Sequence, residues 1–561
     1  MRRGTGPSKP RTLAICILAI SLSAALVGVA SGTPISDLQL TRGFRKAVTV
    51  AGIREHQAAF QDFADANDGI RASGTEGYDL SADYVAGLME DAGFAVTRQP
   101  FNFAFYEELS PSALRQVAPN DVTYTYAEDF LTLDYSGAGE VTAAAVTAVD
   151  IVLAPPRSPV TSGCDGDFAE ESVGGPIFPH PEGPDDFASF PAGHVALMQR
   201  GACSFGLKVV NAQAAGASAA IIFNQGNASD RMDLFPGTLG NPVSIPALGV
   251  ISFEFGEELA NLIDEGLQVD IVTDTISEVR STENVIAETP VGDPTNVVVV
   301  GAHLDSVTAG PGINDNGSGS GTILEIAQVY AQQDRVPRNQ LRFMWYGAEE
   351  SGLLGSEFYV ANLDEDEIAN IAAMVNFDMV GSPNYVRFVY DGDNSAFPAD
   401  PATGVQEGPA GSGAIESLFA DYFEAMFGTA TFEGSAPTPF NGRSDYGPFI
   451  AVDIPAGGLF TGAEGHKTAQ QVTDYGGTAG IQYDPCYHVA CDTFAGTGGA
   501  TDPGLALQAL NEMSDAAAHV VLLLSRRNFA SDPLADPPAT VGAARESTGG
   551  GLGSFSNKAL R

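Results

Sequence analysis

Basic residues are scarce in this chain. Its 561 residues include 70 Asp and Glu but only 27 Lys and Arg, which gives a formal net charge of -43. Nucleic acids and anionic membranes are bound through cationic surfaces, so this composition argues against both as partners. An acidic surface keeps a protein soluble and is compatible with a saline exterior. The few lysines are Lys9, Lys46, Lys208, Lys467 and Lys558.

Long apolar runs are also rare, and only one, at residues 13–30, could span a bilayer. Four basic residues precede it and polar residues 31–33 follow it, which is the layout of a secretory signal peptide cleaved after Ala30. An uncleaved membrane anchor is the alternative, because a run of this length just spans a membrane. Cys16 follows Ile15 rather than a small residue, so we expect no lipid anchor. The mature chain is expected to be secreted, with the periplasm as the alternative.

Cysteine is sparse too. The chain has 5 cysteines, and Cys16 lies in the predicted signal peptide. The other four are an even number in an oxidising compartment, so two disulfides are expected, with free buried thiols as the alternative. Four cysteines allow three connectivities. Spacing favours Cys164 with Cys203 and Cys486 with Cys491, because each pair then lies in one sequence neighbourhood.

Three kinds of sequence pattern follow one another along the chain. Residues 44–96 have a helical pattern. Residues 120–275 contain short apolar runs separated by Gly and Pro, which predicts a mostly β unit with one or two helices. From about residue 283, buried strands alternate with amphipathic helices, so we expect an α/β fold with a mainly parallel or mixed central sheet between helices. The predicted segments are 1–30 (signal), 31–120 and 276–527 (one α/β domain), 121–275 (the β insertion) and 528–561 (a disordered or processed tail).

Metal-binding side chains follow the predicted strands of the α/β domain. In an open sheet of this kind, functional groups collect at the carboxyl ends of the strands. The predicted strand 297–302 ends in His303 and Asp305, and the strand 341–346 leads to Glu349 and Glu350. Asp378 follows the strand 371–377, and the glycine-rich loop 310–317 adds Asp315.

The mixture of imidazole and carboxylate groups suits zinc, and one carboxylate can bridge two ions, as two-metal hydrolases require. The adjacent acids Glu349 and Glu350 suggest that one binds metal while the other takes a proton from water. The sequence therefore indicates a metal-dependent hydrolase.

Five motifs follow one another in the second half of the chain. They are His303-Leu304-Asp305, Gly312-Ile313-Asn314-Asp315-Asn316-Gly317-Ser318-Gly319, Gly347-Ala348-Glu349-Glu350-Ser351-Gly352, Asn376-Phe377-Asp378-Met379 and Cys486-Tyr487-His488-Val489-Ala490-Cys491-Asp492-Thr493. In this order they resemble the motifs of the secreted di-zinc aminopeptidases of the aminopeptidase Y and bacterial leucyl aminopeptidase type. The stretch 193–205 resembles the protease-associated (PA) domain that many members carry as an insertion.

The resemblance implies a role for each motif residue. His303 and Asp378 would bind one zinc, Glu350 and His488 the other, and Asp315 would bridge the two. Glu349 would be the general base, and Tyr487 would donate a hydrogen bond to the oxyanion. Asp305 would orient His303 through its second ring nitrogen. Arg443 and Phe460 resemble substrate-cleft residues. The implied activity is removal of N-terminal residues, with apolar ones such as Leu preferred, by a monomer with two zinc ions; a calcium site is left open.

Two other functions remain as alternatives. A glutamate carboxypeptidase-like exopeptidase shares much of this metal set, but it must hold a substrate carboxylate with several basic residues. Between residues 339 and 527 only six basic residues occur, which favours the aminopeptidase. A binding protein with structural metal ions is the other alternative, and the free acid Glu349 argues against it, because a closed structural site has no use for an unbound carboxylate.

Overall fold

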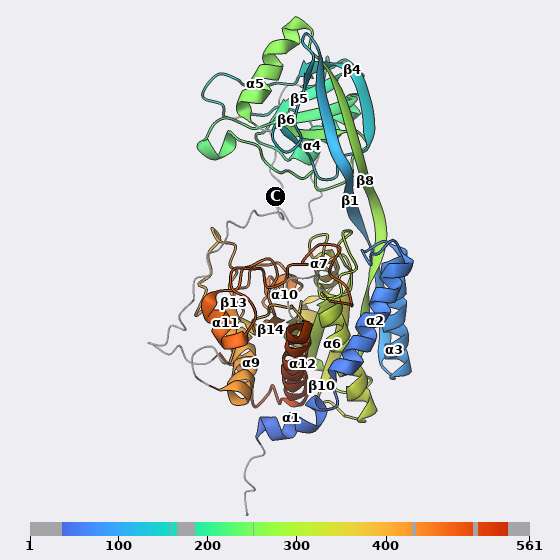
Figure 1. Ribbon diagram of the computed structural model, residues 1–561, viewed down its shortest axis with the longest axis vertical. Helices are drawn as coiled ribbons and strands as arrows, with labels where there is room; N and C mark the ends of the chain where they lie inside the picture. The colour runs from blue at the N-terminus through green and yellow to red at the C-terminus, as the bar shows by residue number, and fades with distance from the viewer. Residues whose placement is uncertain are drawn as a thin grey trace, which may run out of the picture.

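A computed structural model describes residues 36–158, 160–164, 186–250, 252–428, 434–496 and 503–536. The chain forms two units joined by a long two-stranded ribbon (Figure 1). The predicted signal peptide and Cys16 lie outside the described residues. In the part of the chain that is described, no helix is both long and apolar enough to cross a membrane.

The ribbon consists of β1 (Ala95–Ala118) and β8 (Gln268–Glu288). In the smaller unit, β2 (Val122–Thr123), β3 (Phe130–Thr132), β4 (Gly139–Ala148), β5 (Val195–Gln199), α4 (Phe205–Ala214), β6 (Ala219–Phe223), β7 (Ala247–Val250) and α5 (Phe253–Leu262) follow in chain order, with short 3-10 turns at Ser229–Arg231 and Ile263–Glu265.

The larger unit holds the remaining elements. Its helices are α1 (Asp37–Arg45), α2 (Val50–Ala66), α3 (Glu76–Asp91), α6 (Gly317–Gln332), α7 (Leu354–Ala361), α8 (Glu365–Asn370), α9 (Ser412–Phe427), α10 (Tyr446–Ile450), α11 (Ala469–Tyr475) and α12 (Pro503–Arg526). Its strands are β9 (Asp293–His303), β10 (Asn339–Tyr346), β11 (Ile371–Phe377), β12 (Phe388–Tyr390), β13 (Ala436–Thr438) and β14 (Ala456–Phe460).

The sheet of the larger unit has the order β13-β12-β14-β11-β9-β10-β8. β9 pairs in parallel with β10 and β11, and β11 with β14, whereas β8 and β12 add antiparallel pairs. The sheet is therefore mixed with a parallel centre, which confirms the predicted α/β architecture. The predicted strand 371–377 coincides with β11, and the other central strands begin earlier than predicted.

Alternate valines of β9 explain how this sheet is buried on both faces. Val298 and Val300 pack into the core under α2, α3, α6, α9 and α12, whereas Val297 and Val299 pack on the opposite face under α7, α8 and α10. Each fully buried valine contributes about 1.5–3 kcal/mol relative to an exposed one. Because both faces are apolar, polar side chains on this strand are confined to its ends, and His303 is the last residue of β9.

The smaller unit has its own core. Its strands extend the same sheet in the order β8-β4-β5-β6-β7-β3, and apolar clusters lie on both sides of β5 and β6. A disulfide joins Cys164 to Cys203 at the start of α4. These strands and two helices confirm the mostly β character predicted for this region.

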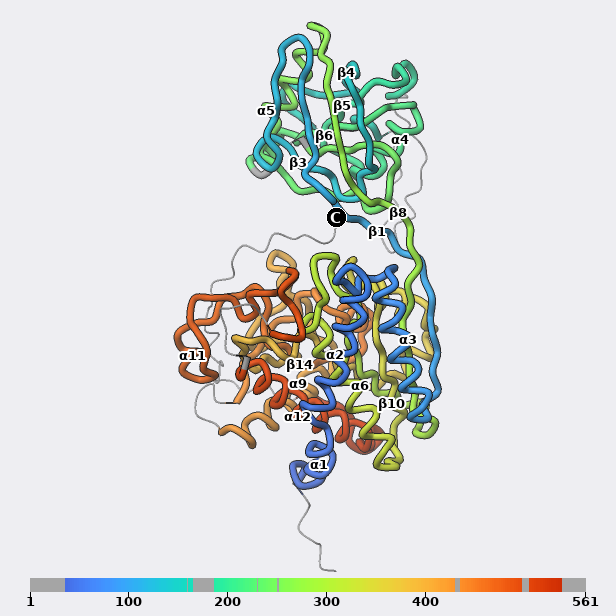
Figure 2. The backbone as a smooth tube through the Cα atoms, turned by 45° about the vertical axis from the view of Figure 1, so that its right-hand side comes forward, coloured from blue at the N-terminus to red at the C-terminus, as the bar shows by residue number. Residues whose placement is uncertain are grey.

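The β1–β8 ribbon carries the smaller unit (Figure 2). The two strands pair antiparallel from Ala95 opposite Glu288 to Ala118 opposite Gln268. Near the larger unit, Phe101, Phe103 and Phe105 form a small cluster with the buried Ala348. The ribbon is thus packed directly on the turn that precedes Glu349.

The chain remains folded beyond α12. Phe529 and Leu534 pack against the larger core, and the carboxylate of Asp536 accepts hydrogen bonds from the backbone N–H groups of Gly411 and Ala414. Ordered structure therefore extends past Arg527, where the sequence places the end of the domain.

Candidate active site

All the predicted metal ligands meet at the carboxyl edge of the parallel strands. His303 ends β9, Asp378 follows β11, and the turn after β10 carries Glu349 and Glu350. Asp315 lies just before α6. Gly312 allows this loop to turn tightly, since it has φ of 62° and a Cβ there would lie 2.3 Å from the carbonyl oxygen of Asp315.

The carboxylate of Asp315 lies between two histidines. Its Oδ1 is 3.2 Å from Nε2 of His303, and its Oδ2 is 3.2 Å from Nε2 of His488. One oxygen therefore faces each imidazole, which is the arrangement a bridging carboxylate needs.

A further carboxylate that could bind a metal ion lies beside each histidine. Oδ1 of Asp378 lies 3.4 Å from Nε2 of His303, and Oε2 of Glu350 lies 3.0 Å from Nε2 of His488. Oδ1 of Asp378 and Oε1 of Glu350 are buried without a hydrogen-bond partner. Buried polar atoms normally have partners, so these orphaned oxygens, in a mixed nitrogen and oxygen donor set, fit metal ions.

Glu349 lies beside this set. Donor atoms of His303, Glu349 and Asp378 are within 4.8 Å of one another. Burial raises the pKa of Glu349 well above its usual range; His303 opposes the rise, and Glu350 and Asp445 add to it. A carboxyl group with a raised pKa accepts and returns a proton readily, as a general base must.

The carboxylates around the two histidines raise the pKa values of both imidazoles. Burial alone would lower the pKa of His488, but Glu350 and Asp315 outweigh it and raise the pKa to about 11. The pKa of His303 is also raised, because Glu349 and Asp378 outweigh burial. Burial would raise the pKa of Asp315, but hydrogen bonds from both histidines lower it. The buried carboxylates therefore favour positive charge at this cluster.

Asp305 lies where the sequence predicts but makes different contacts. Nδ1 of His303 is 3.1 Å from the backbone carbonyl oxygen of Asp305 and 3.6 Å from its carboxylate. The carboxylate instead accepts the backbone N–H groups of Glu349 and Glu350, at 3.2 and 3.3 Å. Asp305 thus orients His303 mainly through its main chain and holds the Glu349–Glu350 turn with its side chain.

Tyr487 and His488 share a short loop closed by the disulfide between Cys486 and Cys491. Both predicted disulfide pairs are therefore confirmed. The rings of Tyr487 and His488 stack, with centroids 3.8 Å apart. Nη2 of Arg443 donates to the Tyr487 hydroxyl at 3.1 Å, and Nη1 pairs with Glu464 at 2.6 Å.

Phe460 ends β14 and stacks on Phe388, with ring centroids 6.0 Å apart. It therefore lies at the same edge of the sheet as the metal set, within an aromatic cluster.

Four residues of this site were missed by sequence reasoning. Ser444 donates to Oδ2 of Asp378 at 2.6 Å. The Asp492 carboxylate accepts the N–H groups of Asn314 and Asp315, and Arg71 donates to the carbonyl oxygens of Leu304, Pro311 and Gly312. Asp445, next to Ser444, is fully buried. Asp492 had a signal, since it lies within a recognised motif, and so did Ser444 and Asp445, which follow Arg443 in a segment that resembles the substrate cleft. Arg71 had none, because it reaches the site through the fold alone.

A further acidic group lies elsewhere, at Asp391, Asp393 and Glu416. The carboxylate of Asp391 already accepts backbone N–H groups from Ser395, Ala396 and Phe397. Those bonds hold a turn, so this group gives no separate support for a calcium site.

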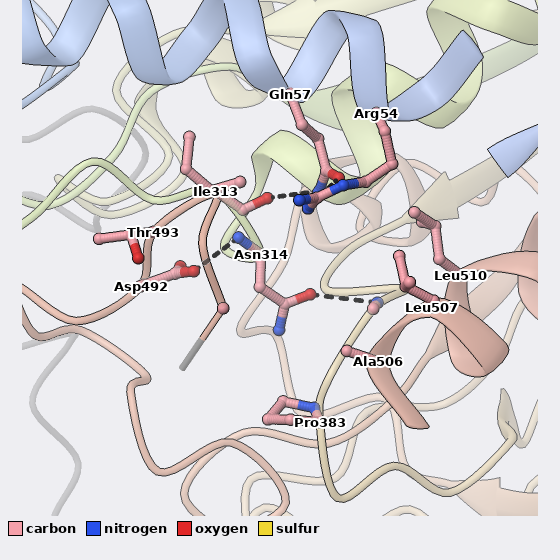
Figure 3. A pocket seen from close by; sticks show the side chains of 12 residues that line it. Arg54, Gln57, Ile313, Asn314, Pro383, Asp492, Thr493, Ala506, Leu507 and Leu510 are labelled. Atoms are coloured by element: carbon pink, nitrogen blue, oxygen red, sulfur yellow. Dashed lines mark hydrogen bonds between the residues drawn. The ribbon is translucent and has the colours of Figure 1, made fainter. Parts of the chain in front are cut away.

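A small cavity lies behind the Asp315 loop (Figure 3). It has a volume of about 50 Å³ and is lined by Gln57 and Arg54 of α2, Asn314, Asp492 and residues of α12. It is too small for a peptide side chain, so it belongs to the support of the loop rather than to substrate binding.

Comparison with known proteins agrees with this geometry. Residues 284–502 match the model of peptidase family M28, and residues 147–259 match the PA domain. An aminopeptidase of Pseudomonas aeruginosa is 44% identical over 483 residues, which cover 86% of this chain and 82% of that protein. A probable leucine aminopeptidase 2 of Aspergillus oryzae is 46% identical over 312 residues, covering 55% of this chain and 59% of that protein.

Among solved structures, the aminopeptidase from Aneurinibacillus sp. strain AM-1 has the same fold, with a TM-score of 0.55 and 24% identity over 90% of this chain and 98% of that one. The extent of the match to the Pseudomonas protein goes well beyond the shared motifs. This chain therefore belongs to peptidase family M28, among its aminopeptidases, and carries an inserted PA domain.

Proposed function

We propose that this chain is a secreted aminopeptidase that uses two zinc ions to remove single N-terminal residues, with apolar residues such as Leu preferred. The observation that carries the proposal is the Asp315 carboxylate, with one oxygen 3.2 Å from His303 and the other 3.2 Å from His488. His303 and Asp378 would hold one ion, Glu350 and His488 the other, and Asp315 both.

When bound, zinc ions lower the pKa of water and polarise a carbonyl group. Glu349 is placed to accept a proton from the attacking water and to pass it to the departing amine, because its carboxyl group lies beside the ligand set. Asp305 keeps Glu349 in place by accepting its backbone N–H.

Tyr487 would donate a hydrogen bond to the substrate oxygen as that oxygen becomes an anion. Burial raises the pKa of Tyr487 far above its usual range, with Asp315 and Glu350 adding to the rise, so the hydroxyl keeps its proton. Arg443 donates to the same hydroxyl, which fixes its position while leaving its proton free for the substrate.

The direction of cleavage follows from charge. A substrate α-ammonium group would enter a site rich in buried carboxylates, whereas a substrate carboxylate would meet few cations. Among the described residues contacting this site, Arg443 pairs with Glu464, and Arg71 is fully buried beneath the loop. This supports an aminopeptidase over a carboxypeptidase.

The test uses one leucine-initiated peptide in free and N-acetylated forms, with metal analysis of the same enzyme preparation. We expect loss of a single N-terminal residue from the free peptide only, and about two zinc ions per chain. Cleavage of the acetylated peptide, or full activity with one tightly held ion, would contradict the proposal.

Secretion is tested separately, by sequencing the N-terminus of the protein recovered from the producing cells. We expect the mature chain to begin at Ser31. A membrane-retained protein that still begins at Met1 would show that the segment is an anchor.

A further inference from the structure

Asp445 is a buried acid that forms no ion pair with the residues that the structure describes. Its exposed fraction is 0%, and neither carboxylate oxygen has a hydrogen-bond partner. The hydroxyl of Ser356 lies close enough to influence it but donates its hydrogen bond to the carbonyl oxygen of Leu353, at 3.1 Å. A buried, unpaired acid is costly, so its presence calls for a physical reason.

The two residues before Asp445 contact residues of the proposed metal site. Arg443 donates to Tyr487, and Ser444 donates to Asp378. Asp445 directly follows Ser444 in the chain and is fully buried, so its carboxyl group lies in the interior beside the same centre. In keeping with this position, the charges of His303, Asp378 and Asp305 affect its pKa. Two consecutive side chains thus contact the site, and the residue that follows them is a buried acid.

The charges around Asp445 are mostly negative. Burial raises its pKa to about 7, His303 opposes this rise, and Asp378 and Asp305 add to it. Among the main contributions to that pKa, the cationic one comes from His303. The nearby buried cation, Arg71, already donates to three backbone carbonyl oxygens. In the metal-free chain, Asp445 therefore adds to an excess of buried acid.

Two bound divalent cations would change the charge around Asp445 from mostly negative to mostly positive. The proposed ligands include three carboxylates, Asp315, Glu350 and Asp378, against the four positive charges of two zinc ions. A further negative charge close by would favour binding of the ions without contacting them. We propose that Asp445 is a positioning residue of the metal centre, whose buried carboxylate favours the zinc-bound protein and destabilises the metal-free protein. This inference rests on the proposed binding of zinc.

The experiment compares the full-length protein with the Asp445→Asn variant in two states. Thermal unfolding is followed in excess chelator and in excess zinc, and zinc affinity is measured by competition with a chromophoric chelator. We expect the variant to unfold a few degrees higher than wild type in chelator. Its affinity for at least one zinc ion should fall about tenfold or more, as expected when one charge near a divalent ion is removed.

Glu512→Gln is the matched control. Glu512 is also a buried acid of this domain, but it pairs with Arg387 at 3.3 Å and accepts from Tyr385 at 2.8 Å. Removing its charge takes away the carboxylate that pairs with Arg387, so the control should unfold earlier in both chelator and zinc while its zinc affinity stays unchanged. The two variants therefore differ in the sign of their effect on the metal-free protein.

Each outcome has one meaning. If Asp445→Asn unfolds earlier in both states, like the control, or keeps wild-type zinc affinity, Asp445 is merely structural and the inference is wrong. A metal-free variant that cannot fold also contradicts it, and Asp445→Ser, which removes the charge with a smaller side chain, checks that the amide itself is not at fault. If wild type takes up no zinc, the proposed function fails together with the inference.

Discussion

Asp492 accepts a hydrogen bond from the backbone N–H of Asp315 at 2.9 Å, across 177 residues of sequence. Its second oxygen accepts the N–H of Asn314 at 2.7 Å. Because Asp492 directly follows the disulfide-closed loop, one carboxylate ties the loop that carries Tyr487 and His488 to the loop that carries Asp315. The two halves of the proposed metal centre are therefore held in register by Asp492.

Asp492→Ala should release the Asp315 loop. Leaving two buried N–H groups without an acceptor costs about 1–3 kcal/mol each, and a shift of about 1 Å in a reacting group can cost about a hundredfold in rate. We expect lower zinc affinity and at least about a tenfold loss of kcat, measured by metal titration and steady-state kinetics. Wild-type zinc content and kcat in a folded variant would show that this hydrogen-bond pair does not position Asp315.

The two disulfides should differ in what they support. Loop-closure entropy assigns about 2 kcal/mol to the short ring at Cys486–Cys491 and about 4 kcal/mol to the Cys164–Cys203 loop. Replacing the first pair by Ser should lower turnover and loosen one zinc with only a modest change in Tm. Replacing the second pair should lower Tm more and leave turnover intact. Full turnover and zinc content in the variant that lacks both Cys486 and Cys491 would contradict this prediction.

Glu349 and Glu350 offer a matched pair of substitutions. Glu349→Gln should retain zinc and the fold but lose about 10²- to 10⁴-fold in turnover, because an amide cannot accept the proton. Glu350→Gln should lose zinc affinity, because the amide removes a charged donor that lies 3.0 Å from His488. Zinc content and kcat together distinguish them, and reversed behaviour would reverse the assignment of base and ligand.

Deleting the PA domain should spare cleavage of leucine anilides if the base of the ribbon is kept. Glu108 pairs with Thr275, so an Asn-Gly turn between these residues should close a hairpin that retains Phe101, Phe103 and Phe105 against Ala348. A shorter hairpin closed between Gln99 and Asn284 removes that cluster and should lower kcat. A folded, zinc-loaded longer form without anilide activity would show that the PA domain takes part in the chemistry.

Two buried histidines outside the site should make the protein sensitive to acid. Burial lowers the pKa of His56 and of His519 to about 4, from 6.5, and their Nδ1 atoms contact Tyr84 and Thr41. The unfolded chain takes up these protons first, so stability is present above pH 6.5 and is lost as the pH falls towards 4. The loss should be roughly 1–3 kcal/mol for each histidine.

The check is the Tm of wild type and His519→Gln between pH 7 and pH 4. The glutamine variant should show a shallower decline, since its unfolded state has one proton fewer to bind. Parallel Tm curves would mean that His519 does not contribute to the acid sensitivity.

The sequence was most informative where chemistry and periodicity coincide. The valine run of β9 predicts a strand buried on both faces, and a polar residue at its end has only the sheet edge to occupy, so the place of His303 follows directly. The ordered motifs place Asp315, Glu349, Glu350, Asp378 and His488 at the same edge, where the structure brings them together.

What could not be predicted depends on contacts between distant segments. Nothing local indicates that the Asp305 carboxylate bonds to the Glu349–Glu350 turn rather than to His303, because the two elements meet only in the folded sheet. That the Asp445 carboxylate is buried without a hydrogen-bond partner depends on the residues packed around it, which the sequence near Asp445 does not reveal. The β1–β8 ribbon was also missed, since each strand gains its partner only across the whole insertion.

That ribbon also bears on how the chain folds. β8 pairs with β10 in the peptidase sheet and with β4 in the PA domain, so the returning end of the insertion joins the catalytic sheet between β10 and β1. If the insertion were unfolded, pairing Ala95 with Glu288 would require closing a very long flexible loop, which costs conformational entropy. A PA domain that has already folded would hold β1 and β8 side by side, so most of this entropy cost would no longer fall on the peptidase domain. If the PA domain folds first, it lowers the entropy cost of assembling the peptidase sheet, and slow folding of the PA domain should then delay assembly of the active site.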